Sequence, residues 1–183
     1  MIGITTEKVT NHPSLREGVG GLCGRIAMAE GDYASCIHIY QQLLDDNPFS
    51  CEYWDNLATA QMQTDQYYDA ITSCDYSLAI SPDNLIALRN KANALYTIGD
   101  YEKAIENCNK HLEVDKYSVE IYYLRGRSYF EQKNFASALA DFEKYVSTWY
   151  EIMSEGCYIS ESETNYAEAK NFCEQCRENL KNQ

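Results

Sequence analysis

The stretch that decides the fold is residues 51–84, CEYWDNLATAQMQTDQYYDAITSCDYSLAISPDN. Its first half places apolar side chains three residues apart at Trp54 and Leu57, and its second half repeats this spacing with Tyr67 and Ala70. A polar segment separates the two halves. This spacing predicts two short amphipathic helices joined by a turn.

The same pattern recurs along the chain with a period of 34 residues and no gap. An aromatic residue opens the second helix of every repeat: Tyr33, Tyr67, Tyr101 and Phe135. A small side chain follows three residues later: Cys36, Ala70, Ala104 and Ala138. One position of each first helix is always Gly or Ala: Gly24, Ala58, Ala92 and Gly126. The chain therefore divides into four repeats, at 17–50, 51–84, 85–118 and 119–152.

This period, its small and aromatic positions, and the closing Pro48 and Pro82 resemble the tetratricopeptide repeat. The resemblance implies an all-α fold, an α-α superhelix (a tetratricopeptide repeat solenoid). One helix pair cannot bury its apolar face alone, so stability must come from the stacking of neighbouring repeats. The family works mainly through protein–protein contacts, and we expect the same here.

The repeats leave a segment at each end. Residues 1–16 form an N-terminal segment, and residues 153–183 form a C-terminal loop and a capping helix expected at 161–181. Ser160 and Glu163 have the spacing of a capping box at the start of that helix.

Composition narrows the class of partner. The chain carries 28 acidic and 15 basic residues, a net charge of −13, which disfavours nucleic acid and anionic membrane surfaces. It has no run of 18 apolar residues, and Met1–Arg16 lacks a secretory signal pattern. We therefore expect a cytoplasmic protein whose eight cysteines are reduced.

No motif points to an enzyme, a cofactor or a small-molecule substrate. Cys173 and Cys176 have the spacing of a metal or redox pair, but they also occupy expected packing positions, and both interpretations stay open. The glycine-rich segment 18–24 departs from both nucleotide-binding patterns. We predict no catalytic residue, no metal site and no cofactor.

The candidate binding surface follows from helix geometry. In the first helix of each repeat, the second, fifth, sixth, ninth, twelfth and thirteenth positions lie opposite the packing face. By resemblance to the family, that side lines a concave groove. The predicted partner-binding residues are Arg25, Asn56, Arg89, Asn90, Asn93, Tyr96, Tyr123, Arg127 and Phe130.

Two features of that groove have alternative interpretations. Asn56 and Asn90 share one position in successive repeats, where an amide can hold an extended peptide backbone or simply be solvated. An apolar residue also recurs at one position of all four first helices, where it either lines the groove or packs against the second helices. The members of this apolar row are Met28, Met62, Tyr96 and Phe130.

The family also includes co-chaperones that grip acidic chaperone tails with a carboxylate clamp of Lys, Arg and Asn residues. In the two frames compared with that clamp, only Asn56 or Asn90 matches, so the usual clamp is absent. We expect an adaptor or scaffold that binds a protein or peptide partner in its groove, as a subunit of a larger assembly. One alternative is a chaperone or co-chaperone without the clamp. Another is an enzyme accessory domain, or a metal- or redox-responsive protein using Cys173 and Cys176.

Overall fold

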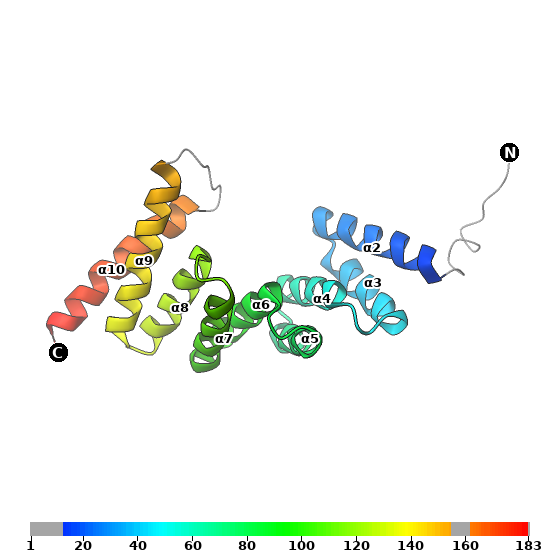
Figure 1. The fold of residues 1–183 in the computed structure, drawn as a ribbon, viewed down its shortest axis with the longest axis horizontal. Helices are drawn as coiled ribbons and strands as arrows, with labels where there is room; N and C mark the ends of the chain where they lie inside the picture. Colours follow the sequence, from blue (N-terminus) through cyan, green and yellow to red (C-terminus); the bar gives the residue numbers. More distant parts are fainter. Residues whose placement is uncertain (1–12, 155–161, 183) are drawn as a thin grey trace. The chain divides into compact units, whose positions relative to one another are not determined.

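The structure, a computed structural model, describes residues 13–154 and 162–182. The described residues form nine α-helices and no strand (Figure 1). The helices are α2 (Pro13–Glu30), α3 (Tyr33–Asp46), α4 (Cys51–Gln63), α5 (Tyr67–Ile80), α6 (Leu85–Thr97), α7 (Tyr101–Val114), α8 (Val119–Glu131), α9 (Phe135–Ser154) and α10 (Ser162–Lys181). The predicted cap residue Ser160 lies outside the described residues.

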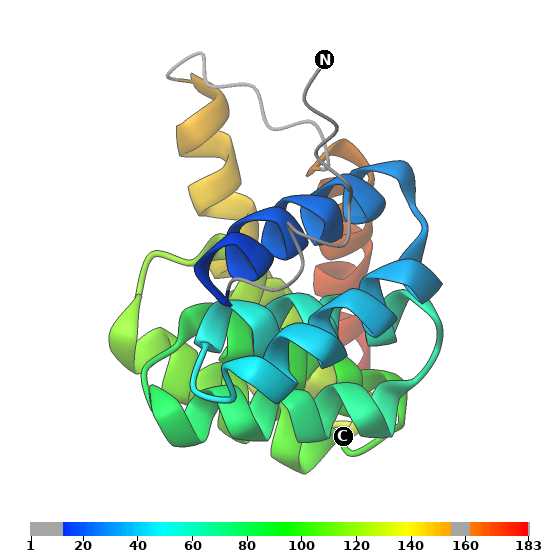
Figure 2. The same ribbon diagram turned by 90° about the vertical axis from the view of Figure 1, so that its right-hand side faces the viewer.

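The chain divides into two compact parts, unit 1 (residues 1–94) and unit 2 (residues 95–183), with the boundary inside α6. In unit 1, α2 packs on α3 (Figure 2), α3 on α4, and α4 on α5. In unit 2, α8 packs on α7 and α9, and α10 lies along α9 (Figure 1). Within the described residues, every helix is too short or too polar to cross a lipid bilayer.

The turn inside each helix pair repeats one backbone conformation. Gly31 and Gly99 have φ angles of +76° and +84°, and Asp65 and Lys133 have φ angles of 59°. These four residues lie 34 positions apart, so the left-handed turn is part of the repeat. Glycine adopts this conformation without cost, whereas a residue with a β-carbon pays about 1 kcal/mol.

Three second helices, α3, α7 and α9, begin with a side-chain cap, whereas Gln66 makes no such bond at the start of α5. The carboxylate of Asp32 accepts from the backbone N–H of Ser35, and that of Asp100 accepts from the N–H of Lys103. Asn134 caps the backbone N–H of Ser137 in the same way at the start of α9. Such caps each stabilise a helix start by about 1 kcal/mol.

Each unit has its own apolar core. In unit 1, Tyr40, Leu43 and Leu57 are buried between α2, α3 and α4. In unit 2, Phe142 and Tyr145 of α9 pack with Ala169, Cys173 and Cys176 of α10. The C-terminal helix is therefore part of the core of unit 2.

Buried polar groups add specific contacts to these cores. Arg125 of α8 forms a bidentate pair with Asp141 of α9, with N···O distances of 2.7 and 2.8 Å, and also donates to Asn109 of α7 at 2.6 Å. Asp141 is 5% exposed.

Candidate partner-binding surface

Part of the predicted surface forms an aromatic and cationic row in unit 2. The guanidinium carbon of Arg127 in α8 lies 4.5 Å from the ring centre of Tyr96 and 5.6 Å from that of Tyr123. Both distances fit cation–π contacts. The two rings fix the guanidinium, so its planar set of N–H donors is oriented before any ligand arrives.

Tyr123 connects this row to the C-terminal helix. Its hydroxyl donates a short hydrogen bond to the carboxylate of Glu168 in α10. Burial, together with this hydrogen bond to a carboxylate, raises the pKa of the Tyr123 phenol far above its usual value. The phenol therefore stays protonated and remains a donor at neutral pH.

Tyr96 is also held on both sides. Its ring contacts Tyr101 of α7 with a centroid separation of 5.5 Å, in addition to the Arg127 contact. Burial raises the pKa of Tyr96, and Arg127 partly offsets this shift. The resulting row consists of Tyr96, Arg127, Tyr123 and Glu168, which we call the Arg127 row.

Phe130 contributes to the core more than to an open groove. Its ring meets Phe135 of α9 edge-on at 5.5 Å and Phe172 of α10 edge-on at 4.9 Å. The other members of the predicted apolar row are also engaged, because Met28 and Met62 pack against the apolar clusters of unit 1. These contacts favour the packing interpretation of that row.

In unit 1, two predicted residues remain accessible. Arg25 of α2 forms an exposed ion pair with Glu52 of α4 at 3.7 Å. Asn56 of α4 is half-buried, and its side chain makes no hydrogen bond to another described residue. An exposed ion pair contributes little to stability, so Arg25 is available to exchange partners.

Asn90 is placed differently from the expectation that its amide is open. It is 6% exposed, and its amide nitrogen donates to the Thr59 hydroxyl at 3.0 Å. This bond links α6 to α4 across adjacent repeats, so Asn90 acts as part of the packing of unit 1. Arg89 and Asn93, also on α6, are half-buried and take part in further interactions within the protein.

Asp55 is the fifth residue of its repeat, a position that helix geometry predicts to lie opposite the packing face, and this prediction is wrong for Asp55 because the residue is buried. Asp55 is 6% exposed and accepts hydrogen bonds from the Ser77 hydroxyl at 2.7 Å and the Asn84 amide at 2.8 Å. Asn84 in turn caps the first backbone N–H groups of α6. The carboxylate thus joins α4, α5 and the start of α6.

The cysteine pair lies inside the core. Cys173 and Cys176 are 5% and 0% exposed, and burial raises the pKa of Cys176 to about 11. Among the described residues, no three His, Cys, Asp or Glu side chains gather closely enough to hold a metal ion. The geometry therefore favours the packing interpretation of this pair.

Sequence reasoning missed the contribution of α10 to the surface. Glu168 and Phe172 complete the surroundings of Tyr123 and Phe130, yet neither was among the predicted residues. Part of the signal was present, since the sequence predicts a capping helix at 161–181. The sequence did not show how α10 is aligned along α8, and therefore which α10 residues contact Tyr123 and Phe130.

Comparison with known proteins settles the family. The family model described as Tetratricopeptide repeat matches residues 24–84, 56–118 and 89–151. The chain belongs to the tetratricopeptide repeat family. The all-α, α-α superhelix class expected from the 34-residue period is confirmed.

Two curated proteins match over 92 residues, half of this chain. The small glutamine-rich tetratricopeptide repeat-containing protein 2 of Mycosarcoma maydis is 34% identical, and the Protein STIP1 homolog of Dictyostelium discoideum is 25% identical. The matched segment spans 26% and 16% of these relatives.

Solved tetratricopeptide structures share the fold over more of the chain. MamA from Desulfovibrio magneticus RS-1 has a TM-score of 0.71 at 14% identity, covering 92% of this chain and 97% of that one. The first TPR of Spaghetti (RPAP3), bound to the HSP90 peptide SRMEEVD, has a TM-score of 0.60 at 18% identity, covering 71% and 92%. At these identities the likeness shows the fold.

Proposed function

We propose that this protein is a non-catalytic adaptor or assembly subunit that captures a segment of a partner protein on the Arg127 row of unit 2. Membership of the tetratricopeptide repeat family supports a role in protein–protein interaction. The observation that carries the site is the position of Arg127, clamped between Tyr96 and Tyr123.

The chemistry of the row favours an acidic contact from the partner. Arg127 forms no ion pair with a described carboxylate, although the whole chain carries a net charge of −13. A fixed guanidinium binds a carboxylate through two parallel hydrogen bonds. The ligand is therefore a peptide of mixed polarity that presents an Asp or Glu side chain, or its C-terminal carboxylate, to Arg127.

The proposed class of partner rests on the net charge of the chain, and the proposed location rests on its free thiols. The net charge disfavours nucleic acid and anionic lipid as partners. The described cysteines are all free, which suits a reducing, cytoplasmic location, and Cys157 lies outside the described residues. The proposal includes no small-molecule substrate and no catalytic step.

A clamp-free chaperone or co-chaperone is the second candidate. Its support comes from the names of similar proteins, which include a STIP1 homolog and a domain bound to an HSP90 peptide. The clamp positions of this chain are largely unmatched. The peptide SRMEEVD should therefore bind no better than a scrambled version, as calorimetry can measure. Sequence-dependent micromolar binding would instead establish the co-chaperone role.

The test of the adaptor proposal starts from a tagged pull-down with mass spectrometry, followed by affinity measurements on the partner segment. Arg127→Ala should weaken binding about 10- to 100-fold, the loss expected for a charge-assisted hydrogen-bond pair. Arg127→Lys keeps the charge and should recover only part of the affinity. Binding should also weaken with added salt.

Lys170→Glu is the matched control. Lys170 is an exposed cation on α10, and its ammonium lies 5.6 Å from the Tyr166 ring, outside the Arg127 row. The Lys170→Glu substitution should leave the affinity for the partner segment unchanged. If Arg127→Ala leaves the affinity for the partner unchanged and Lys170→Glu abolishes binding, the binding surface lies on the outer side of α10.

A further inference from the structure

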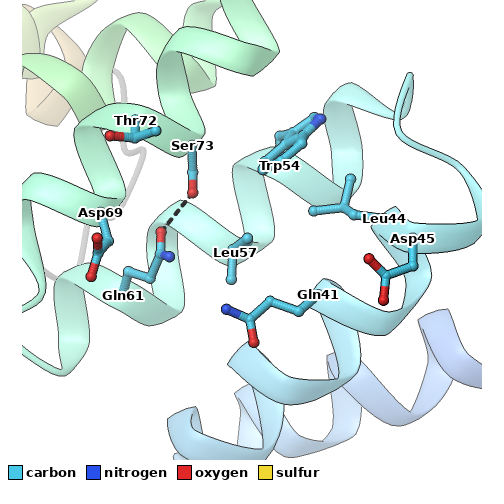
Figure 3. Close-up of a pocket in the computed structure, with 9 residues that line it drawn as sticks. All are labelled: Gln41, Leu44, Asp45, Trp54, Leu57, Gln61, Asp69, Thr72 and Ser73. Atoms are coloured by element: carbon cyan, nitrogen blue, oxygen red, sulfur yellow. Dashed lines mark hydrogen bonds between the residues drawn. The ribbon is translucent and has the colours of Figure 1, made fainter.

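A second surface feature lies in unit 1. An open pocket of about 440 Å³ is formed by three consecutive helices, α3, α4 and α5 (Figure 3). The residues that line it are Gln41, Leu44, Asp45, Trp54, Leu57, Gln61, Asp69, Thr72 and Ser73. No motif in the sequence had pointed to this set.

The floor of the pocket is apolar and rigid. Leu44 and Leu57 are 7% and 3% exposed. Trp54 is fixed at two points, because its indole N–H donates to the carbonyl of Pro48 at 2.8 Å and its ring stacks on Tyr76 at 4.5 Å. A ligand that meets this floor pays little for ordering the side chains of the protein.

The side chain of Gln61 presents a hydrogen-bond donor to the pocket. Gln61 is 5% exposed, and its amide oxygen accepts from the Ser73 hydroxyl at 2.7 Å, which fixes the orientation of the amide. The amide nitrogen has no hydrogen-bond acceptor among the described residues and points along the pocket toward Leu57 (Figure 3). An amide N–H group that has no acceptor within the protein favours a ligand that supplies a carbonyl oxygen.

The charged side chains that line the pocket are all acidic. Asp69 of α5 and Asp45 of α3 lie at opposite ends of the lining, with Leu57 and Gln61 of α4 between them (Figure 3). The lining contains no Lys, Arg or His. An incoming segment with cationic groups on both sides of an apolar centre is complementary to this arrangement.

We propose that this pocket binds a short extended segment of a partner protein with the pattern basic–x–aliphatic–x–basic. The aliphatic side chain enters between Leu44, Leu57 and Trp54, and a backbone carbonyl of the segment accepts from Gln61. Alternate side chains of an extended chain point the same way, so the flanking basic residues reach Asp45 and Asp69. The protein thus has a second peptide site of opposite charge preference to the Arg127 row.

The experiment measures fluorescence anisotropy of a labelled peptide, Lys-Ser-Leu-Ser-Lys with blocked ends, on the full chain. Two matched peptides test the pattern, one with both Lys replaced by Glu and one with Leu replaced by Gly. The parent peptide should bind at least about 10-fold more tightly than either, because each change removes a main contact. Equal binding of the parent and the Glu peptide would overturn the proposal.

Protein variants locate the site. Thr72 is an exposed residue of the lining, so Thr72→Arg places a cation in the pocket and should abolish binding. Ala79→Arg, on the exposed side of the same helix and outside the lining, should have no effect. Asp45→Asn and Asp69→Asn should each weaken binding about 2- to 5-fold, against no change for the exposed Asp83→Asn.

The outcome is independent of the proposed function. Arg127→Ala should leave binding of this basic peptide unchanged, and Thr72→Arg should leave the acidic partner segment unaffected. If Thr72→Arg binds the peptide like the unmodified chain, while circular dichroism shows that both are folded, this pocket is not the site.

Discussion

The ring of Tyr40 lies against Gly24 so closely that a β-carbon on residue 24 would stand 2.6 Å from Tyr40 Cζ. The same repeat position is Ala58 and Ala92 in the next two repeats, so the glycine reflects the size of the tyrosine beneath it. Close approach of two helices, rather than a special backbone angle, is what requires glycine here.

Gly24→Ala should therefore destabilise the protein by about 1–2 kcal/mol. The added methyl group forces Tyr40 to shift within a packed core, and this cost exceeds the gain in helix propensity. Gly18→Ala, on the same helix, is the control, since no atom lies within 4 Å of the position of its β-carbon. It should stabilise by about 0.5–1 kcal/mol. Urea denaturation measures the change in the free energy of unfolding for each variant. Equal changes of the same sign would contradict the close-packing explanation.

The buried pair of Arg125 and Asp141 gives a second prediction. Arg125→Met leaves the 5% exposed Asp141 without its cation, and should cost about 3–5 kcal/mol in the free energy of unfolding. The double variant Arg125→Met with Asp141→Leu removes both charges and should recover most of that loss. If the double variant is as unstable as the single one, packing rather than charge pairing dominates at this place.

Asp55 predicts a dependence of stability on pH. Burial raises the pKa of this carboxyl, and the hydrogen bonds from Asn84 and Ser77 oppose the shift without cancelling it. A carboxyl whose folded-state pKa lies above its unfolded value of about 3.9 stabilises the fold most when protonated. That contribution is present at low pH and is lost as the pH rises through the folded-state pKa.

Asp55→Asn provides the measurement for this prediction, because the amide does not titrate in the same range. The advantage of the unmodified protein over Asp55→Asn, in urea denaturation, should be larger at pH 4 than at pH 7.5. The opposite trend would show that the hydrogen bonds to Asp55 outweigh its burial. Dilute protein is needed at the lower pH, since the isoelectric point is about 4.6.

Thiol reactivity gives a prediction for the cysteines. Cys23 is exposed, whereas burial raises the pKa of Cys74 and of Cys108 to about 12. Since the thiolate is the reactive form, a disulfide reagent at pH 8 should modify Cys23 rapidly and the buried thiols only after unfolding. Cys23→Ser should remove a fast phase that Cys74→Ser leaves in place. A fast phase of undiminished amplitude in Cys23→Ser would assign the reactivity to another thiol.

The repeat pattern was enough to predict the helix pairs, because the 34-residue period encodes which side of each helix faces its own partner. Asn90 and Asp55 show where this information ends. A helical wheel describes one helix, whereas the acceptor of the Asn90 amide, Thr59, belongs to the preceding repeat. The partners of Asp55 likewise come from α5 and the loop before α6.

The candidate sites were predictable to different degrees, because a helical wheel shows the faces of single helices but not the contacts between helices. Arg127 and Tyr96 come from equivalent faces of successive first helices, so the wheel placed both on one surface. Glu168 required the register of α10 against α8, which the repeat does not specify. The pocket in unit 1 combines residues of three helices that share no periodic position, so no single-helix pattern could reveal it.

The two tryptophans of the chain are divided between the units, Trp54 in unit 1 and Trp149 in unit 2. Their surroundings differ, since Trp54 stacks on Tyr76 and Trp149 on Tyr166 at 4.2 Å. Each unit therefore carries a built-in fluorophore. In the Trp149→Phe variant the tryptophan emission comes from Trp54 and reports the melting of unit 1 alone. In the Trp54→Phe variant it comes from Trp149 and reports the melting of unit 2. Without any attached dye, the chain can show whether its two halves lose their structure at one temperature or at two.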